Sequence, residues 1–165
     1  VTLDPDFRLF RRLTPDEAPP ILRQIMVDHS TETILLSEKS DARDVSQELA
    51  GKLLHRTPKI ASLADTGKVT SILVIGLQDQ VNKWLDLNKL PPRPLNMRRD
   101  GTAYAWTIRQ DGVTFVVVSA KDAPSLQSLV RPLPHYGRQS YIVFDGAKAI
   151  ERGTWPARVQ EITLN

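Results

Sequence analysis

The stretch "RPLPHYGRQSYIVF" at 131–144 holds the densest group of chemically capable side chains in the sequence. An imidazole and a hydroxyl stand five residues apart in it, and such a pair could in principle support acyl transfer. The serine, however, lacks the glycine-flanked turn that exposes a nucleophile in serine hydrolases. A stand-alone hydrolase is therefore the weakest of the readings that this stretch allows. The candidate interface or binding loop consists of His135, Tyr136, Arg138, Gln139 and Ser140.

The position of this loop along the chain predicts which edge of a sheet it occupies. It follows a predicted helix and precedes the apolar run "SYIVF" at 140–144, so it lies at the amino end of a strand. Ligand sites in α/β sheets gather at the opposite edge, where the carboxyl ends of parallel strands meet. We therefore expect the loop to fix neighbouring backbone or to dock the domain on another surface, with peptide or ligand binding as the alternative.

Metal and phosphate chemistry lack their usual signatures in this sequence. There is no cysteine, so a thiolate nucleophile or a thiolate metal ligand is excluded. His29, His55 and His135 are far apart, and none belongs to the His-Glu-x-x-His pattern of zinc peptidases. Gly76 is a single glycine between a predicted strand and a predicted helix, whereas nucleotide loops need several glycines. We expect no catalytic residue, no metal ligand and no cofactor in this chain.

Composition narrows the class of protein and of partner. The 165 residues are 41% hydrophobic and 25% charged, which is typical of one globular domain. The net charge of +3 is a small excess, and the densest basic runs are only Arg8, Arg11 and Arg12, and then Arg98 and Arg99. We interpret these charges as solvated surface, so nucleic acid is not an expected partner. No apolar run is long enough to predict a transmembrane segment in this fragment. A carbohydrate- or peptide-binding module is the second functional reading, with stacking surfaces that could come from Trp84, Trp106, Trp155 and Tyr136.

Hydrophobic periodicity from residue 31 onward predicts an α/β (α+β) domain. The run at 70–77 is almost wholly apolar, as a strand covered on both faces would be. The dipeptide Asp111-Gly112 favours a tight hairpin turn. The order β-α-β-α-β-β-α-β(-β) predicts a mixed sheet with helices packed on it. The expected strands are 33–37, 70–77, 140–144 and 147–156, with a hairpin over 102–122, and the expected helices begin at Ser40 or Asp41, run over 78–88, and begin after Asp122.

Residues 1–30 lack this regular period and contain several prolines. A short helix could begin at Thr14 with Pro15 in its first turn, but Pro19 and Pro20 would soon interrupt it. We therefore predict an irregular N-terminal arm or linker over 1–30 and a single α/β accessory domain over 31–165. The first residue is Val rather than Met, so we expect the chain to be a piece of a longer protein.

Two segments of the chain resemble one known family. The segments are "LDPDFRLFRRLTPDEAPPIL" at 3–22 and "RPLPHYGRQSYIVFDGAKAIERGTWP" at 131–156. Together they resemble the C-terminal region of bacterial aminopeptidase N-like zinc metallopeptidases of the secreted or membrane-linked subgroup. In that group a Leu-Asp-Pro-x-Phe-x-x-Phe-Arg-Arg-Leu segment follows the peptidase body, and a Leu-Pro-His-Tyr-Gly-x-Gln-Ser-Tyr segment occurs near the end.

The resemblance implies a role without catalysis, because the zinc-binding His-Glu-x-x-His set of that family is missing here. It implies a non-catalytic accessory or interdomain-packing domain whose partner is the upstream domain of the same polypeptide. Zinc would belong only to the catalytic domain of the parent protein, and the location would be periplasmic or extracellular. The arm would contact the upstream module through Phe7, Phe10 and Leu13.

Overall fold

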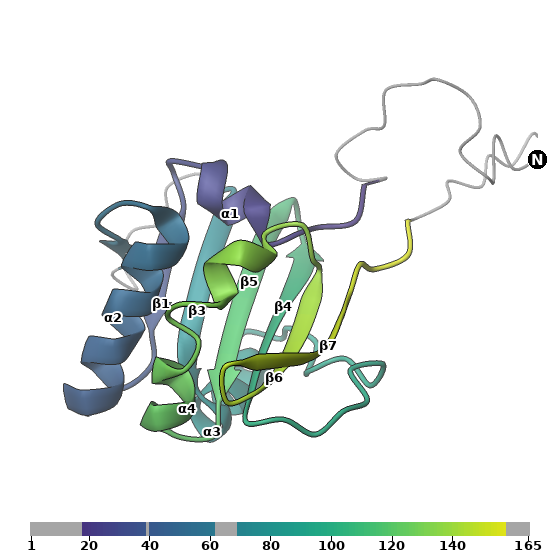
Figure 1. The fold of residues 1–165 in the computed structure, drawn as a ribbon. Helices are drawn as coiled ribbons and strands as arrows, with labels where there is room; N and C mark the ends of the chain where they lie inside the picture. Colours follow the sequence, from purple (N-terminus) through teal and green to yellow (C-terminus); the bar gives the residue numbers. More distant parts are fainter. Residues whose placement is uncertain (1–17, 39, 62–68, 158–165) are drawn as a thin grey trace, which may run out of the picture.

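A seven-stranded mixed sheet forms the centre of the computed structural model, which describes residues 18–38, 40–61 and 69–157 (Figure 1). The strand order is β2-β1-β3-β5-β4-β6-β7. The first four strands in this order run parallel, and the remaining neighbours pair antiparallel. The predicted α/β fold with a mixed sheet is confirmed. The elements are α1 (Arg23–Val27), β1 (Glu32–Leu35), α2 (Ser40–Leu54), β2 (Lys59–Ile60), β3 (Ser71–Leu77), α3 (Gln78–Leu87), β4 (Ala103–Gln110), β5 (Val113–Ala120), α4 (Ala123–Gln127), the 3-10 helix η1 (Leu133–Tyr136), β6 (Tyr141–Asp145) and β7 (Lys148–Gly153).

The hairpin of β4 and β5 confirms the clearest local prediction. Asp111 and Gly112 have φ angles of 51° and 78°, so both adopt the left-handed conformation that a two-residue hairpin turn requires. The start of α4 is also as expected, because Asp122 accepts a hydrogen bond from the Ser125 backbone N–H at 2.9 Å. Hydrogen bonding from Ser125 lowers the pKa of the Asp122 carboxyl, as the charged form is the better acceptor.

The central strands are apolar on both sides because both sides of the sheet are covered. Val116 and Val118 of β5 face one core, while Val117 between them faces the other. Helices α1, α2 and α4 lie on the first face (Figure 1), and α3 packs on the second. The proline-rich segment 88–102 also covers the second face, with Leu90 and Met97 buried against the sheet.

The packed domain begins earlier than the predicted border at residue 31. Leu22 and Ile25 are 0% exposed and belong to the core beneath α2. The described end of the predicted arm is therefore part of the domain from Pro20 onward, and α1 is a helix that the proline content concealed. The predicted helix start at Thr14 lies outside the described residues.

Two further elements were not predicted. Strand β2 is two residues long and η1 is a single turn, and neither leaves a readable period in a sequence. Gly76 is explained by packing, since a Cβ there would come within 2.9 Å of the Leu36 Cβ.

Candidate functional site

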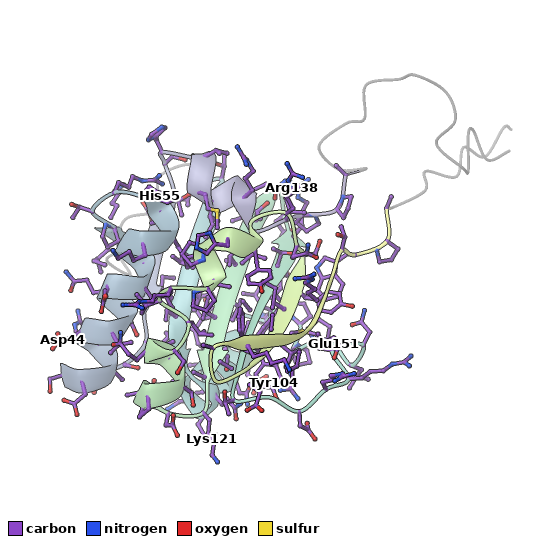
Figure 2. All side chains as sticks on the ribbon, viewed as in Figure 1. Asp44, His55, Tyr104, Lys121, Arg138 and Glu151 are labelled. Atoms are coloured by element: carbon purple, nitrogen blue, oxygen red, sulfur yellow. The ribbon has the colours of Figure 1, made fainter. Side chains whose placement is uncertain are left out.

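The loop formed by η1 and residues 137–140 lies at the amino end of the parallel strands, as its position in the sequence predicted. Figure 2 shows Arg138 and His55 at this end of the molecule, with Lys121 and Tyr104 at the opposite end. Ser140 immediately precedes β6, which runs in the same direction as β5 because both pair antiparallel with β4. The loop is thus remote from the carboxyl edge where α/β ligand sites usually form.

Main-chain hydrogen bonds join this loop to the chain that leads into α1. The Leu22 N–H donates to the Gln139 carbonyl at 2.9 Å, and the Arg23 N–H donates to the Gly137 carbonyl at 2.7 Å. These two donors belong to the start of a helix, where backbone N–H groups have no partner within the helix. We call the loop 133–140 together with residues 20–23 the clamp.

Side chains complete the clamp around the carbonyl oxygen of Pro20. The buried Ser140 hydroxyl donates to this oxygen at 2.6 Å, and the Thr107 hydroxyl donates to it at 2.9 Å. The Trp155 indole N–H in turn donates to the Thr107 Oγ1 at 2.9 Å. Three segments far apart in the sequence therefore meet at one backbone carbonyl.

Aromatic and glycine residues pack the clamp tightly. The Tyr136 ring meets the Phe144 ring edge to face at a centroid distance of 5.7 Å. A Cβ at Gly137 would lie 3.1 Å from the Met26 sulfur, so a larger residue there would push against α1. Tyr141 and Trp155 stack with centroids 4.6 Å apart, which fixes the strand end next to Ser140.

The geometry gives no support to the hypothesis that this loop is the active site of a hydrolase. Ser140 is 0% exposed and its hydroxyl already donates to Pro20, so it does not face a substrate. His135 is exposed on the outer side of the loop and makes no hydrogen bond to Ser140. The predicted residues are neighbours, but they divide into an inner structural part and an outer part that faces solvent.

The outer part of the loop lines a basic cavity of about 530 Å³ between η1, α1 and the end of α2. No Asp or Glu of the described chain lines this cavity. The Arg152 guanidinium lies 5.6 Å from the centroid of the Tyr136 ring, which holds one of the cations over the loop. The cationic and imidazole side chains that line the basic cavity are Arg23, His55, His135, Arg138 and Arg152.

An apolar groove of about 430 Å³ lies on the other side of the clamp. Ala18 and Ala157, the first and last described residues, both line it. The two described ends of the chain therefore meet around one groove (Figure 1). Its remaining lining is mainly proline: Pro19, Pro20, Pro91, Pro92, Pro94, Thr107, Ile108, Arg109, Trp155 and Pro156.

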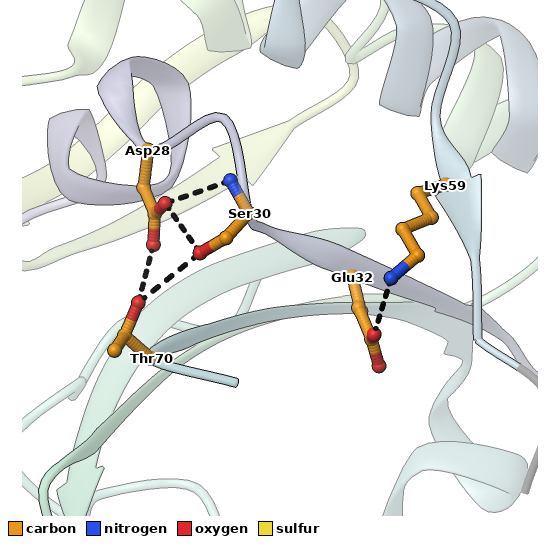
Figure 3. A network of polar contacts seen from close by, with 5 residues as sticks. All are labelled: Asp28, Ser30, Glu32, Lys59 and Thr70. Carbon is orange, nitrogen blue, oxygen red and sulfur yellow. Dashed lines mark hydrogen bonds and ion pairs between the residues drawn. The ribbon is translucent and has the colours of Figure 1, made fainter. Parts of the chain in front are cut away.

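A polar cluster at the same edge of the sheet was not predicted from the sequence. Asp28 accepts from the Ser30 N–H and hydroxyl at 2.8 and 2.6 Å and from the Thr70 hydroxyl at 2.8 Å (Figure 3). Burial acts to raise the pKa of Asp28, but the hydroxyl donors outweigh it and hold that pKa well below its ordinary value. Nearby, Lys59 forms an ion pair with Glu32 at 2.9 Å. The spacing of Asp28 and Ser30 signals a local turn, but the contact with Thr70 has no sequence signature.

The tryptophans offer little free stacking surface. Trp106 is 1% exposed, Trp155 is stacked and hydrogen-bonded, and Trp84 is half-buried against Phe115 at a centroid distance of 6.3 Å. The carbohydrate-binding reading therefore has no exposed aromatic platform among the described tryptophans.

The described residues bear on only some of the remaining predictions, which concern metal sites, membrane spans and the arm. No group of three or more His, Asp or Glu side chains in the described ranges is placed to hold a metal ion. No helix in the same ranges has the length and apolar character needed to cross a bilayer. The predicted arm contacts Phe7, Phe10 and Leu13 lie outside the described residues.

Comparisons with known proteins supply no further constraint on the site. The sequence matches no protein-family model, and it has no significant match among curated proteins. The proposals below therefore rest on the resemblance of two segments, on the residues themselves and on their geometry.

Proposed function

We propose that this chain is a non-catalytic accessory domain that packs against the upstream domain of the same polypeptide. The parent would be an aminopeptidase N-like zinc metallopeptidase located in the periplasm or outside the cell, as the resemblance implies. Zinc would be held by the parent's catalytic domain alone. The observation that carries the proposal is the clamp, because it attaches the chain leading into the domain to residues 137–140, which belong to the second of the two resembling segments.

A clamp of this kind suits an accessory domain for a mechanical reason. Two main-chain hydrogen bonds and the Ser140 hydroxyl fix residues 20–23 on the sheet edge, so the preceding chain starts from a rigid point. A rigid start limits how far the domain can turn relative to whatever comes before it. The domain would then be held in a set orientation instead of swinging on a loose linker.

The two hollows beside the clamp provide a surface for the same partner. The apolar groove begins at Ala18, so an upstream domain lies within reach of it. The basic cavity adds positive charge on the other side of the loop, where Arg138 is exposed. Interfaces combine an apolar centre with charged groups that set orientation, and these hollows offer both.

Calorimetric titration of this chain with the upstream region of its parent tests the proposal. We expect measurable binding that falls by about tenfold when His135→Ala and Arg138→Ala are combined, since exposed charges at an interface set orientation and rate. Lys121→Ala removes one exposed cation at the opposite end (Figure 2) and should leave binding unchanged. Absence of binding by the unaltered chain would overturn the proposal, as would zinc-dependent cleavage of aminoacyl reporter substrates by the chain alone.

A further inference from the structure

A cavity of about 420 Å³ lies between α3 and the proline-rich segment that follows it. We call it the α3 cavity. Its floor is the sheet, where Ser119 of β5 stands beside Tyr104 of β4 and provides little bulk. Its volume falls within the range of small-molecule sites, roughly 300 to 1,000 Å³. The residues that line it are Gln78, Asn82, Leu85, Asp86, Pro92, Arg93, Trp106 and Ser119.

The indole N–H of Trp106 gives this cavity a hydrogen-bond donor that the described chain does not use. Trp106 lines the cavity and is 1% exposed, yet its Nε1 has no hydrogen-bond partner among the described residues. A buried donor without an acceptor is destabilising, so such groups are nearly always satisfied. Trp155 shows the usual outcome, because its N–H donates to Thr107. A ligand atom that accepts a hydrogen bond would satisfy Trp106 in the same way.

One cation of the cavity is held in place from within the chain. The Arg93 guanidinium lies 4.0 Å from the centroid of the Tyr104 ring. Stacking on an aromatic face restricts the side chain while its N–H groups stay available at the edge. Arg93 is therefore a positioned donor for an acidic group in the cavity.

One anion of the cavity lies on the helix that forms its wall. Asp86 follows Gln78 and Asn82 at intervals of four residues, so the three polar side chains form one stripe along α3. Val81 and Leu85 of the same helix are buried against the sheet. Asp86 and Arg93 line the same cavity, but they form no ion pair with each other. Both side chains are therefore available to a molecule bound in the cavity.

We propose that the α3 cavity binds a free α-amino acid. The ligand carboxylate would accept from Arg93 and from the Trp106 N–H, and its ammonium group would donate to Asp86. The amide groups of Gln78 and Asn82 would contact the polar part of the ligand, and Leu85 and Pro92 would contact its side chain. This assignment does not depend on the proposed packing against an upstream domain, because Pro92 is the one residue of the α3 cavity that also lines the apolar groove, and none of the cavity's lining residues belongs to the basic cavity.

The test uses a panel of L-leucine, L-phenylalanine, L-arginine and L-glutamate at millimolar concentration. Binding is followed by the ¹H–¹⁵N resonance of the Trp106 indole, assigned by its loss in Trp106→Phe. We expect at least one amino acid to shift this resonance. The matching acid without the ammonium group and the matching amine without the carboxylate should each bind about tenfold more weakly, the loss that corresponds to one charged hydrogen bond.

Paired substitutions separate the proposed contacts from general effects of charge. Asp86→Asn should weaken binding about tenfold, whereas Asp79→Asn on the same helix, outside the α3 cavity, should not change it. Arg93→Gln should also weaken binding about tenfold. Its control, Arg98→Gln, alters an exposed arginine of the same segment and should leave binding unchanged. The assignment is overturned if no member of the panel shifts the indole resonance, or if the matching acid or amine binds as well as the amino acid. Equal effects of Asp86→Asn and Asp79→Asn would also overturn it.

Discussion

The clamp and the α3 cavity differ in whether their polar groups have hydrogen-bond partners within the chain. In the clamp, the Ser140 hydroxyl, the Thr107 hydroxyl and the Trp155 N–H bond to one another or to backbone. In the α3 cavity, the Trp106 N–H and the charges of Asp86 and Arg93 have no such hydrogen bonds or ion pairs among the described residues. Polar groups that are satisfied within the chain contribute to stability, whereas groups left beside a cavity are available for a ligand.

This comparison gives each region its own expected response to substitution. Changes in the clamp should lower the free energy of unfolding. Changes to the polar lining of the α3 cavity should lower binding of the proposed ligand with little effect on stability, because those side chains have few partners to lose. Of the three predictions below, the first two test the clamp, and the third tests the separate cluster around Asp28, whose polar groups are also satisfied within the chain. They run from the largest expected effect to the smallest.

Leu22→Ala should give the largest loss in the clamp. Leu22 is 0% exposed in the core, so truncation removes buried contacts and leaves a cavity. We expect the free energy of unfolding to fall by about 2 to 5 kcal/mol in chemical denaturation. Val27→Ala, in the helix that Leu22 precedes, alters a side chain that is 58% exposed and should change the free energy of unfolding by less than about 0.5 kcal/mol. Equal effects of the two variants would mean that the chain around α1 is a linker after all.

Ser140→Ala should give a smaller loss. It removes the hydrogen bond to the Pro20 carbonyl, which keeps the Thr107 hydroxyl as a second donor. We expect a decrease of about 1 kcal/mol and faster amide hydrogen exchange at Leu22 and Arg23. Ser128→Ala removes a hydroxyl that bonds within its own helical turn at 3.0 Å and serves as the control. Unchanged exchange at Leu22 and Arg23 in Ser140→Ala would show that the side chain does not hold the clamp closed.

Asp28→Asn should mainly change the pH dependence of stability. The pKa of Asp28 is lowered in the folded chain, so its carboxylate stabilises the fold above the ordinary value of about 3.9. This contribution is lost as pH falls through the lowered pKa. The unaltered chain should therefore lose stability below about pH 4 more steeply than Asp28→Asn, whose side chain does not titrate.

Thermal unfolding between neutral and strongly acid pH measures this difference. At neutral pH we expect Asp28→Asn to cost less than about 1 kcal/mol, because the site is partly solvated and the amide oxygen can still accept. Asp44→Asn alters an exposed carboxylate of α2 and should retain the acid dependence of the unaltered chain. Parallel pH profiles for the unaltered chain and Asp28→Asn would contradict the assigned role of the Asp28 cluster.

Local features explain where prediction from sequence was accurate. The Asp111-Gly112 turn, the Asp122 cap and the apolar run of β3 depend on residues close together in the chain, and their conformations follow from steric and hydrogen-bonding preferences. The α1 helix was missed because it is five residues long and follows two prolines. Its helical form depends on burial of Leu22 and Ile25 under α2, a contact between segments that only the fold brings together.

For the candidate sites too, local features could be predicted from the sequence, whereas contacts between distant segments could not. The sequence by itself determined the order of the longer helices and strands, the mixed sheet and the location of the histidine loop at the amino end of a strand, because periodicity and chain direction are local properties. Only the tertiary structure decided that Ser140 is enclosed by Pro20 and Thr107, which lie 120 and 33 residues away. It also brought Asp86, Arg93 and Trp106 around one cavity, because distant segments meet only when the two faces of the sheet are covered.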